Sequence, residues 1–128
     1  MRILGFSKYW INYLTGKPKL YSDTFSTFRY SRKDRDWQVG EKIQIVMNPR
    51  SPRKEWLGVA EIIAKEQRNV GWVKIPGVKD LTFREAMEDG FKRKSKMVGW
   101  LYNLYGDKIL TVPINKLVIK WVEKSQIF

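Results

Sequence analysis

The chain has 128 residues, no cysteine, no histidine and a formal net charge of +12, from 25 lysines and arginines against 13 acidic residues. The missing side chains exclude disulfides, zinc–thiolate sites, imidazole metal ligands and Ser–His or Cys–His nucleophile pairs. This length suits a single domain, residues 1–128, whose core needs neither disulfides nor metals. The excess of positive charge favours a phosphate-rich partner, of which RNA is the simplest.

The sequence gives no indication of a membrane segment or a leader. No run approaches the roughly 18 apolar residues that cross a bilayer. The first residues also lack a long apolar run followed by a small-residue cleavage site. We therefore expect a cytoplasmic protein with no membrane partner and no cofactor.

The first half of the chain reads as strands separated by turns. A short helix is expected over residues 8–15, where Trp10 and Leu14 have helical spacing and Gly16 follows as a cap. Alternating apolar and polar residues and β-branched side chains indicate strands elsewhere. These strands are expected over residues 2–6, 24–30, 42–47, 56–66 and 70–75.

The second half of the chain brings two helices together before a last strand. Thr82 and Glu85 form a capping-box pattern, which predicts a helix over residues 83–89. A second helix is expected over residues 96–105 with Ser95 as its cap, and a strand over residues 115–122. Together these elements predict an α+β fold, a curled sheet or β-barrel of five to seven strands with about three short helices.

Basic residues gather in two loops and in one run before the second helix, at residues 31–36, 49–54 and 92–96. Loops that follow successive strands lie at opposite ends of a sheet, so the rest of the fold must decide whether they share a surface. Tyr30 and Trp37 are candidates to stack a base, the alternative being that they pack over the barrel mouth. Trp10, Trp100 and Trp121 are expected in the core, and Trp56 and Trp72 beside turns. The candidate nucleic-acid-binding residues are Arg29, Tyr30, Arg32, Lys33, Arg35, Trp37, Arg50, Arg53, Lys54, Lys92, Arg93 and Lys94.

Several segments taken together resemble the ASCH (activating signal cointegrator homology) domain of the PUA-like superfamily. They are GK…TFR, W-x-VGEKIQIV, LGVAEII, EAMEDGF, WLxxLYG and PINKLVIKW, in this order between Gly16 and Trp121. The resemblance implies a PUA-type barrel with flanking helices and RNA binding in a cleft between them. Some members of the family look like ribonucleases, and one small type is similar to an amidohydrolase acting on an acetylated nucleoside.

The resemblance also implies a catalytic set of Lys17, Thr27 and Asp89. The family pattern resembles G-x-K-x-x-T-x-R, whose end fits residues 27–29. The nearest lysines upstream are Lys19 and Lys17, and Gly16-Lys17 resembles the first half of the pattern, with residues 18–23 as an insertion. The carboxylate falls at Asp89, or alternatively at Glu88.

Structural roles compete with these assignments. Lys17 can complement the dipole of a preceding helix. Arg29 can bind phosphate or can pair with Asp89 or Glu61.

Three functions follow from the sequence. The first is an RNA-binding domain without chemistry, which engages single-stranded or looped RNA through a basic cleft. The second is a hydrolase acting on an acetylated nucleoside or RNA, which needs a lysine with a lowered pKa. The third is an interaction domain for an acidic protein partner. Because the two halves of the lysine motif are split, we expect binding rather than catalysis.

Overall fold

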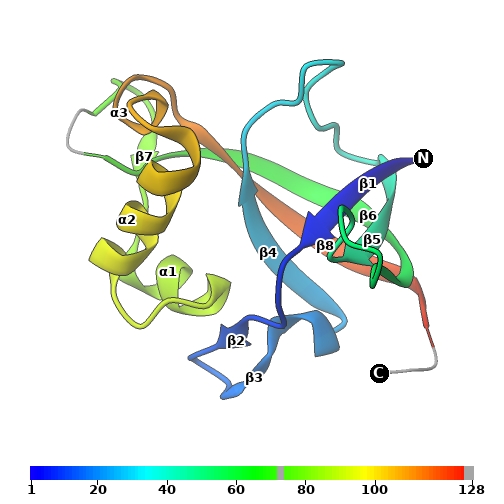
Figure 1. The fold of residues 1–128 in the computed structure, drawn as a ribbon. Helices are drawn as coiled ribbons and strands as arrows, with labels where there is room; N and C mark the ends of the chain where they lie inside the picture. The colour runs from blue at the N-terminus through cyan, green and yellow to red at the C-terminus, as the bar shows by residue number, and fades with distance from the viewer. Residues whose placement is uncertain (72–73, 126–128) are drawn as a thin grey trace.

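The computed structural model describes residues 1–71 and 74–125 and shows a curled sheet flanked by helices (Figure 1). The strand order in the main sheet is β1-β5-β6-β8-β4, and β7 pairs with β6. The strands are β1 (Arg2–Phe6), β4 (Thr24–Arg29), β5 (Lys42–Met47), β6 (Glu55–Asn69), β7 (Lys79–Asp80) and β8 (Ile114–Lys124). The long antiparallel pair β6 and β8 forms the middle of the sheet, and its register shifts mark where the sheet bends.

Three short helices gather beside one end of the curled sheet (Figure 1). They are α1 (Phe83–Asp89), α2 (Lys94–Tyr105) and α3 (Lys108–Thr111). The predicted α+β class, with a curled sheet and about three short helices, is confirmed. Within the described residues, no helix is long and apolar enough to cross a membrane.

The core has two parts, and the chain's apolar periodicities account for both. One part fills the inside of the curled sheet, with Ile43, Ile62 and Ile119 fully buried. The other joins the helices to the far end of the sheet, where Met97 of α2 packs near Ile114 of β8. The curled sheet and the helical group therefore each have a buried apolar cluster of their own.

Helix α1 is held to the sheet by a buried ionic cluster around Glu85. Its carboxylate lies 3.0 Å from Arg68 Nε of β6 and 2.8 Å from Lys116 Nζ of β8. The same carboxylate accepts a hydrogen bond from the backbone N–H of Thr82, which completes the predicted capping box. The cluster fixes the position of α1, whose last residue is Asp89.

The predicted helix over residues 8–15 is wrong. The chain instead forms a small hairpin of β2 (Ile11–Asn12) and β3 (Lys17–Pro18), followed by a 3-10 turn, η1 (Lys19–Tyr21). Trp10 packs against aromatic residues of the helical group, whereas Leu14 remains 39% exposed. The two side chains therefore do not share the buried face that a helix would have required.

The expected strand over residues 70–75 is also wrong where it is described. The side-chain amide of Asn69 donates to the carbonyls of Ile75 and Val78, and its oxygen accepts from the N–H of Ile75. These bonds hold the segment as a loop, and Trp72 lies outside the described residues. Ser95 does not cap α2, because that helix begins at Lys94, two residues before the predicted start, and Ser95 lies within it.

Candidate functional site

A cleft lies where the curled sheet stays open, between its edge strands β1 and β4. The two strands are not neighbours in the sheet. Arginine side chains bridge the gap instead, since Arg29 donates to the carbonyl of Gly5 and Arg32 to that of Ile3, each at 2.8 Å. The adjoining cleft, of about 990 Å³, is lined by both edge strands and by residues of the helical group.

A buried ion pair forms part of the cleft lining. Lys19 Nζ lies 2.6 Å from Asp89 Oδ1 and also donates to the carbonyl of Ser26 at 3.0 Å. The Lys19 side chain is only 3% exposed and that of Asp89 12%. Because η1, α1 and β4 each contribute one group, the pair links the hairpin, the helices and the sheet.

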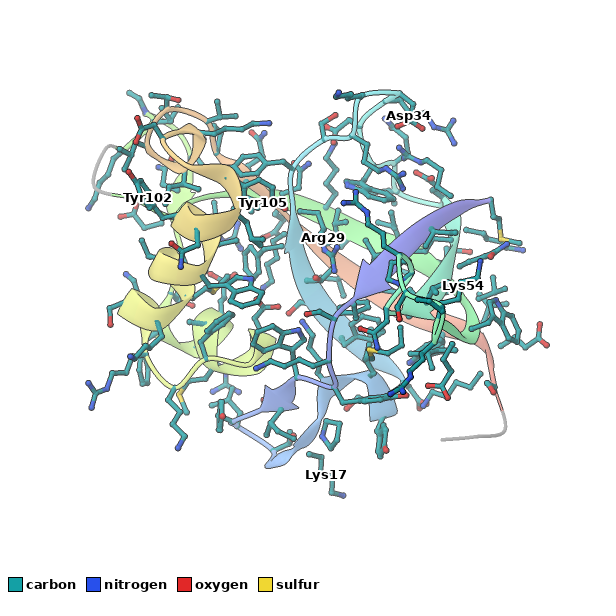
Figure 2. All side chains as sticks on the ribbon, in the orientation of Figure 1. Lys17, Arg29, Asp34, Lys54, Tyr102 and Tyr105 are labelled. Atoms are coloured by element: carbon teal, nitrogen blue, oxygen red, sulfur yellow. The ribbon has the colours of Figure 1, made fainter. Side chains whose placement is uncertain are left out.

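Arg29 and Thr27 stand beside this pair on one face of β4. Arg29 Nε donates to Thr27 Oγ1 at 3.2 Å, and the guanidinium lies 4.9 Å from the Phe6 ring centroid. In the described part of the chain, Arg29 forms no ion pair with Asp89 or with Glu61, so neither expected pairing is present. Figure 2 shows Arg29 near the centre of the molecule, between the sheet and the helical group that carries Tyr105.

The site perturbs the ionisation of its own groups. Burial lowers the pKa of Lys19, and the nearby Arg29 charge acts in the same direction, against the attraction of Asp89. Burial raises the pKa of Asp89, against the opposing effects of Lys19 and Arg29. The neutral amine and neutral acid are therefore closer in energy to the charged pair than they are in water.

Two polar atoms of the cluster remain available to a ligand. Among the described residues, Asp89 Oδ2 accepts no hydrogen bond and Arg29 Nη1 donates none. The described side chains contain no completely buried nitrogen or oxygen atom that lacks a partner, so neither of these two atoms is completely buried. The cleft thus offers one acceptor and one donor from residues that lie close enough to influence each other's ionisation.

Aromatic residues form the walls of the cleft. Tyr30 contacts Tyr105 edge-on at 4.8 Å, and its hydroxyl donates to the carbonyl of Val112. Trp37 is 2% exposed and donates through Nε1 to the carbonyl of Tyr30. Tyr30 and Trp37 are therefore not exposed stacking residues as predicted; they pack at the barrel mouth, which was the alternative.

Positive charge dominates the cleft lining. Asp89 is the one acidic residue in this lining. The cationic residues are Lys19, Arg29, Arg32, Arg50 and Lys108. Both predicted basic loops reach this surface at their first residues, because each loop begins against β1. Arg32 donates to the carbonyl of Ile3. Pro49 lies so close to Gly5 that a Cβ atom on Gly5 would be 2.5 Å from the proline ring. The tips of the loops diverge, as Asp34 and Lys54 show (Figure 2).

The structure does not bring Lys17, the predicted catalytic lysine, into the cleft. Lys17 is exposed on β3 and points away from the cleft (Figure 2), whereas Lys19, two residues later, pairs with Asp89. The difference arises because the backbone N–H of Lys19 bonds the carbonyl of Trp10, which directs η1 inward. Thr27 and Asp89 do line the cleft together.

The remaining predicted binding residues divide between the cleft and other surfaces. Arg29, Arg32 and Arg50 line the cleft, and Lys92 and Arg93 line a second hollow beside it. The predicted cations outside both hollows are Lys33, Arg35, Arg53, Lys54 and Lys94. Sequence reasoning missed the cleft contributions of Lys108 and Trp100, which come from parts of the helical group whose arrangement only packing shows.

Scans of the chain against protein-family models, curated proteins and solved structures found no match. The resemblance to ASCH domains therefore stays a prediction.

Proposed function

We propose that this protein binds single-stranded or looped RNA and that one nucleotide of the RNA enters the cleft. The observation that carries the proposal is the cleft lining, in which five cationic side chains meet one carboxylate between aromatic walls. Clustered cations attract the phosphate backbone, and unstacked bases are commonly held against aromatic side chains. The volume of about 990 Å³ lies at the upper end of small-molecule sites, about 300–1,000 Å³, and accommodates a nucleotide.

The free polar atoms of the cleft suit a nucleobase. Each base presents hydrogen-bond donors and acceptors along its edge. Asp89 Oδ2 accepts from an amino or imino group, while Arg29 Nη1 donates to a carbonyl or ring nitrogen. Arg32, Arg50 and Lys108 then meet the negative charge of the phosphates. In this proposal phosphate contact supplies most of the affinity, and Asp89 and Arg29 orient the base.

The test is the salt dependence of binding to a labelled RNA, followed by fluorescence anisotropy. If about five phosphates are contacted, the log–log slope is expected to be roughly −3.5, from about −0.7 per contact. Arg32→Ala with Arg50→Ala should flatten the slope by roughly 1.4 on the same basis. The matched control is Lys33→Ala with Arg53→Ala, which removes two cations from the same loops but outside the cleft.

The two double variants must differ for the proposal to stand. Equal flattening by the control pair would place binding outside the cleft. An affinity that does not depend on salt would contradict RNA binding and favour an acidic protein partner instead.

A second candidate function is hydrolysis of an N-acyl group on a nucleoside. It is favoured by the Lys19–Asp89 pair, which shares the cleft with Thr27 and in which burial lowers the pKa of Lys19. In such a reaction water adds to the acyl carbon, the C–N bond breaks, and the amine leaves with a proton. A neutral Lys19 amine has the chemistry to accept the proton of the attacking water, and Arg29 to stabilise the oxyanion.

We expect the wild-type protein to bind RNA without releasing acetate from N4-acetylcytidine. Lys19 and Thr27 are each 3% exposed, and Thr27 Oγ1 already accepts a hydrogen bond from Arg29, so neither is well placed to meet a substrate. Acetate is measured by an enzyme-coupled assay over several hours. Release that Asp89→Asn abolishes while the fold is retained would establish the hydrolase instead.

A further inference from the structure

A second hollow, of about 840 Å³, adjoins the cleft on the side of the helices. Four cationic residues line it and no acidic residue does; the cations are Lys8, Lys92, Arg93 and Lys96. Three aromatic residues line both the hollow and the cleft, namely Trp10, Phe91 and Trp100. These three residues, which we call the aromatic ridge, therefore border both basic depressions.

The ridge is packed and yet accessible. Its ring centroids lie 5.1 Å apart for Trp10 and Phe91, and also 5.1 Å apart for Trp10 and Trp100. Gly90, at φ +118°, lets Trp10 approach so closely that a Cβ there would lie 2.9 Å from it. Trp100 nevertheless remains 39% exposed. The ridge thus presents a fixed aromatic surface to solvent, which is the arrangement that stacks a base at low entropic cost.

The cations of the hollow are not neutralised by the protein itself. Within the described residues, none of the four forms an ion pair with a carboxylate. Lys8 instead lies 3.9 Å from the Trp10 ring centroid, and Lys92 lies 5.6 Å from that of Tyr13. Grouped like charges repel one another and attract anions from solution. The hollow is therefore complementary to a polyanion that also carries flat aromatic groups.

We propose that the RNA strand runs from the cleft across the aromatic ridge into this hollow, which binds the phosphates of the neighbouring nucleotides. The inference rests on the proposed function and specifies the ligand further: the site reads at least two linked nucleotides rather than a free nucleoside. One base occupies the cleft, the next stacks on Trp100, and Lys92, Arg93 and Lys96 contact the phosphates that follow.

The experiment compares two double variants with two probes. Lys92→Ala with Lys96→Ala removes two cations from the hollow, and Lys42→Ala with Lys120→Ala removes two exposed lysines from the sheet. The probes are a labelled ten-nucleotide RNA of mixed sequence and the four ribonucleoside 5′-monophosphates. The hollow variant should bind the RNA roughly 25-fold more weakly at 0.1 M salt, from two contacts of about 0.7 log units each. Its binding of the monophosphates should be unchanged, and the sheet variant should match wild type with both probes.

Trp100→Ala tests the stacking of a base on the ridge independently of the cations in the hollow. Loss of one stacked base should weaken RNA binding by roughly 5- to 150-fold and leave the salt slope unchanged. The inference is overturned if the hollow and sheet variants bind the RNA alike, or if the hollow variant loses the monophosphates to the same extent. In the first case the cleft still binds RNA, so the proposed function survives. Failure of the wild-type protein to bind the RNA removes the proposed function itself.

Discussion

Lys19→Met is expected to destabilise the protein by about 3–5 kcal/mol, because it leaves the Asp89 carboxylate buried without its partner. The two groups are 2.6 Å apart, and both side chains are largely excluded from solvent. The ammonium of Lys19 also satisfies the carbonyl of Ser26, which the variant leaves unpaired. The free energy of unfolding is measured by urea titration, followed by tryptophan fluorescence.

The chain offers a matched control two residues away. Lys17→Met alters an exposed lysine outside the cleft, so its effect should stay within about 0.5 kcal/mol. The double variant Lys19→Met, Asp89→Leu should recover much of the loss, because it removes the buried charge altogether. Equal stabilities for Lys17→Met and Lys19→Met would contradict the assignment of Lys19 as the buried partner.

Glu85→Ala should cost about 3–5 kcal/mol as well, since it leaves Lys116 without its ion-pair partner and takes from Arg68 one of its two carboxylates, the other being Glu66. Arg68 and Lys116 both lie within 3.0 Å of its carboxylate. The variant also removes the side chain that bonds the Thr82 N–H at the start of α1. Because α1 carries Asp89, RNA affinity should fall together with stability.

The control for this variant lies on the same helix. Glu88 forms a surface pair with Arg84 at 3.4 Å, and Glu88→Ala should change stability by no more than about 0.5 kcal/mol. A loss at Glu88 as large as that at Glu85 would show that helix propensity, and not the buried cluster, sets the effect. Thermal unfolding followed by circular dichroism separates the two.

The same cluster makes stability depend on pH. Burial alone would raise the pKa of Glu85, but the hydrogen bonds from Lys116 and Thr82 and the charge of Arg68 outweigh it and hold the pKa below its ordinary 4.5. The stabilisation is therefore present above pH 4.5 and is lost as the pH falls through the lower folded-state pKa. When the pH is lowered from neutral to below 4.5, the free energy of unfolding of Glu85→Gln should therefore fall by less than that of the wild-type protein, because glutamine does not titrate.

Local patterns in the sequence determined most of the regular elements. The capping box at Thr82 and the αL glycine at Gly90 define α1 from neighbouring residues alone, and the structure has α1 at Phe83–Asp89, as predicted. Alternation of apolar and polar side chains likewise placed β5 at Lys42–Met47. These features depend on hydrogen bonds and side-chain faces within a few residues, so a single segment carries the information.

The site itself depended on tertiary structure. Trp10 and Leu14 have helical spacing, yet Trp10 packs on Phe91 and Trp100, and that long-range contact replaces the helix with a hairpin. The hairpin in turn leaves Lys17 in solvent and brings Lys19 to Asp89, 70 residues away in the chain. The resemblance to ASCH domains predicted Lys17, Thr27 and Asp89 as one set, and the structure brings Thr27 and Asp89 to one cleft but leaves Lys17 outside it. Which lysine enters it was decided by packing, because burial of one amine beside a carboxylate depends on contacts between segments far apart in the chain.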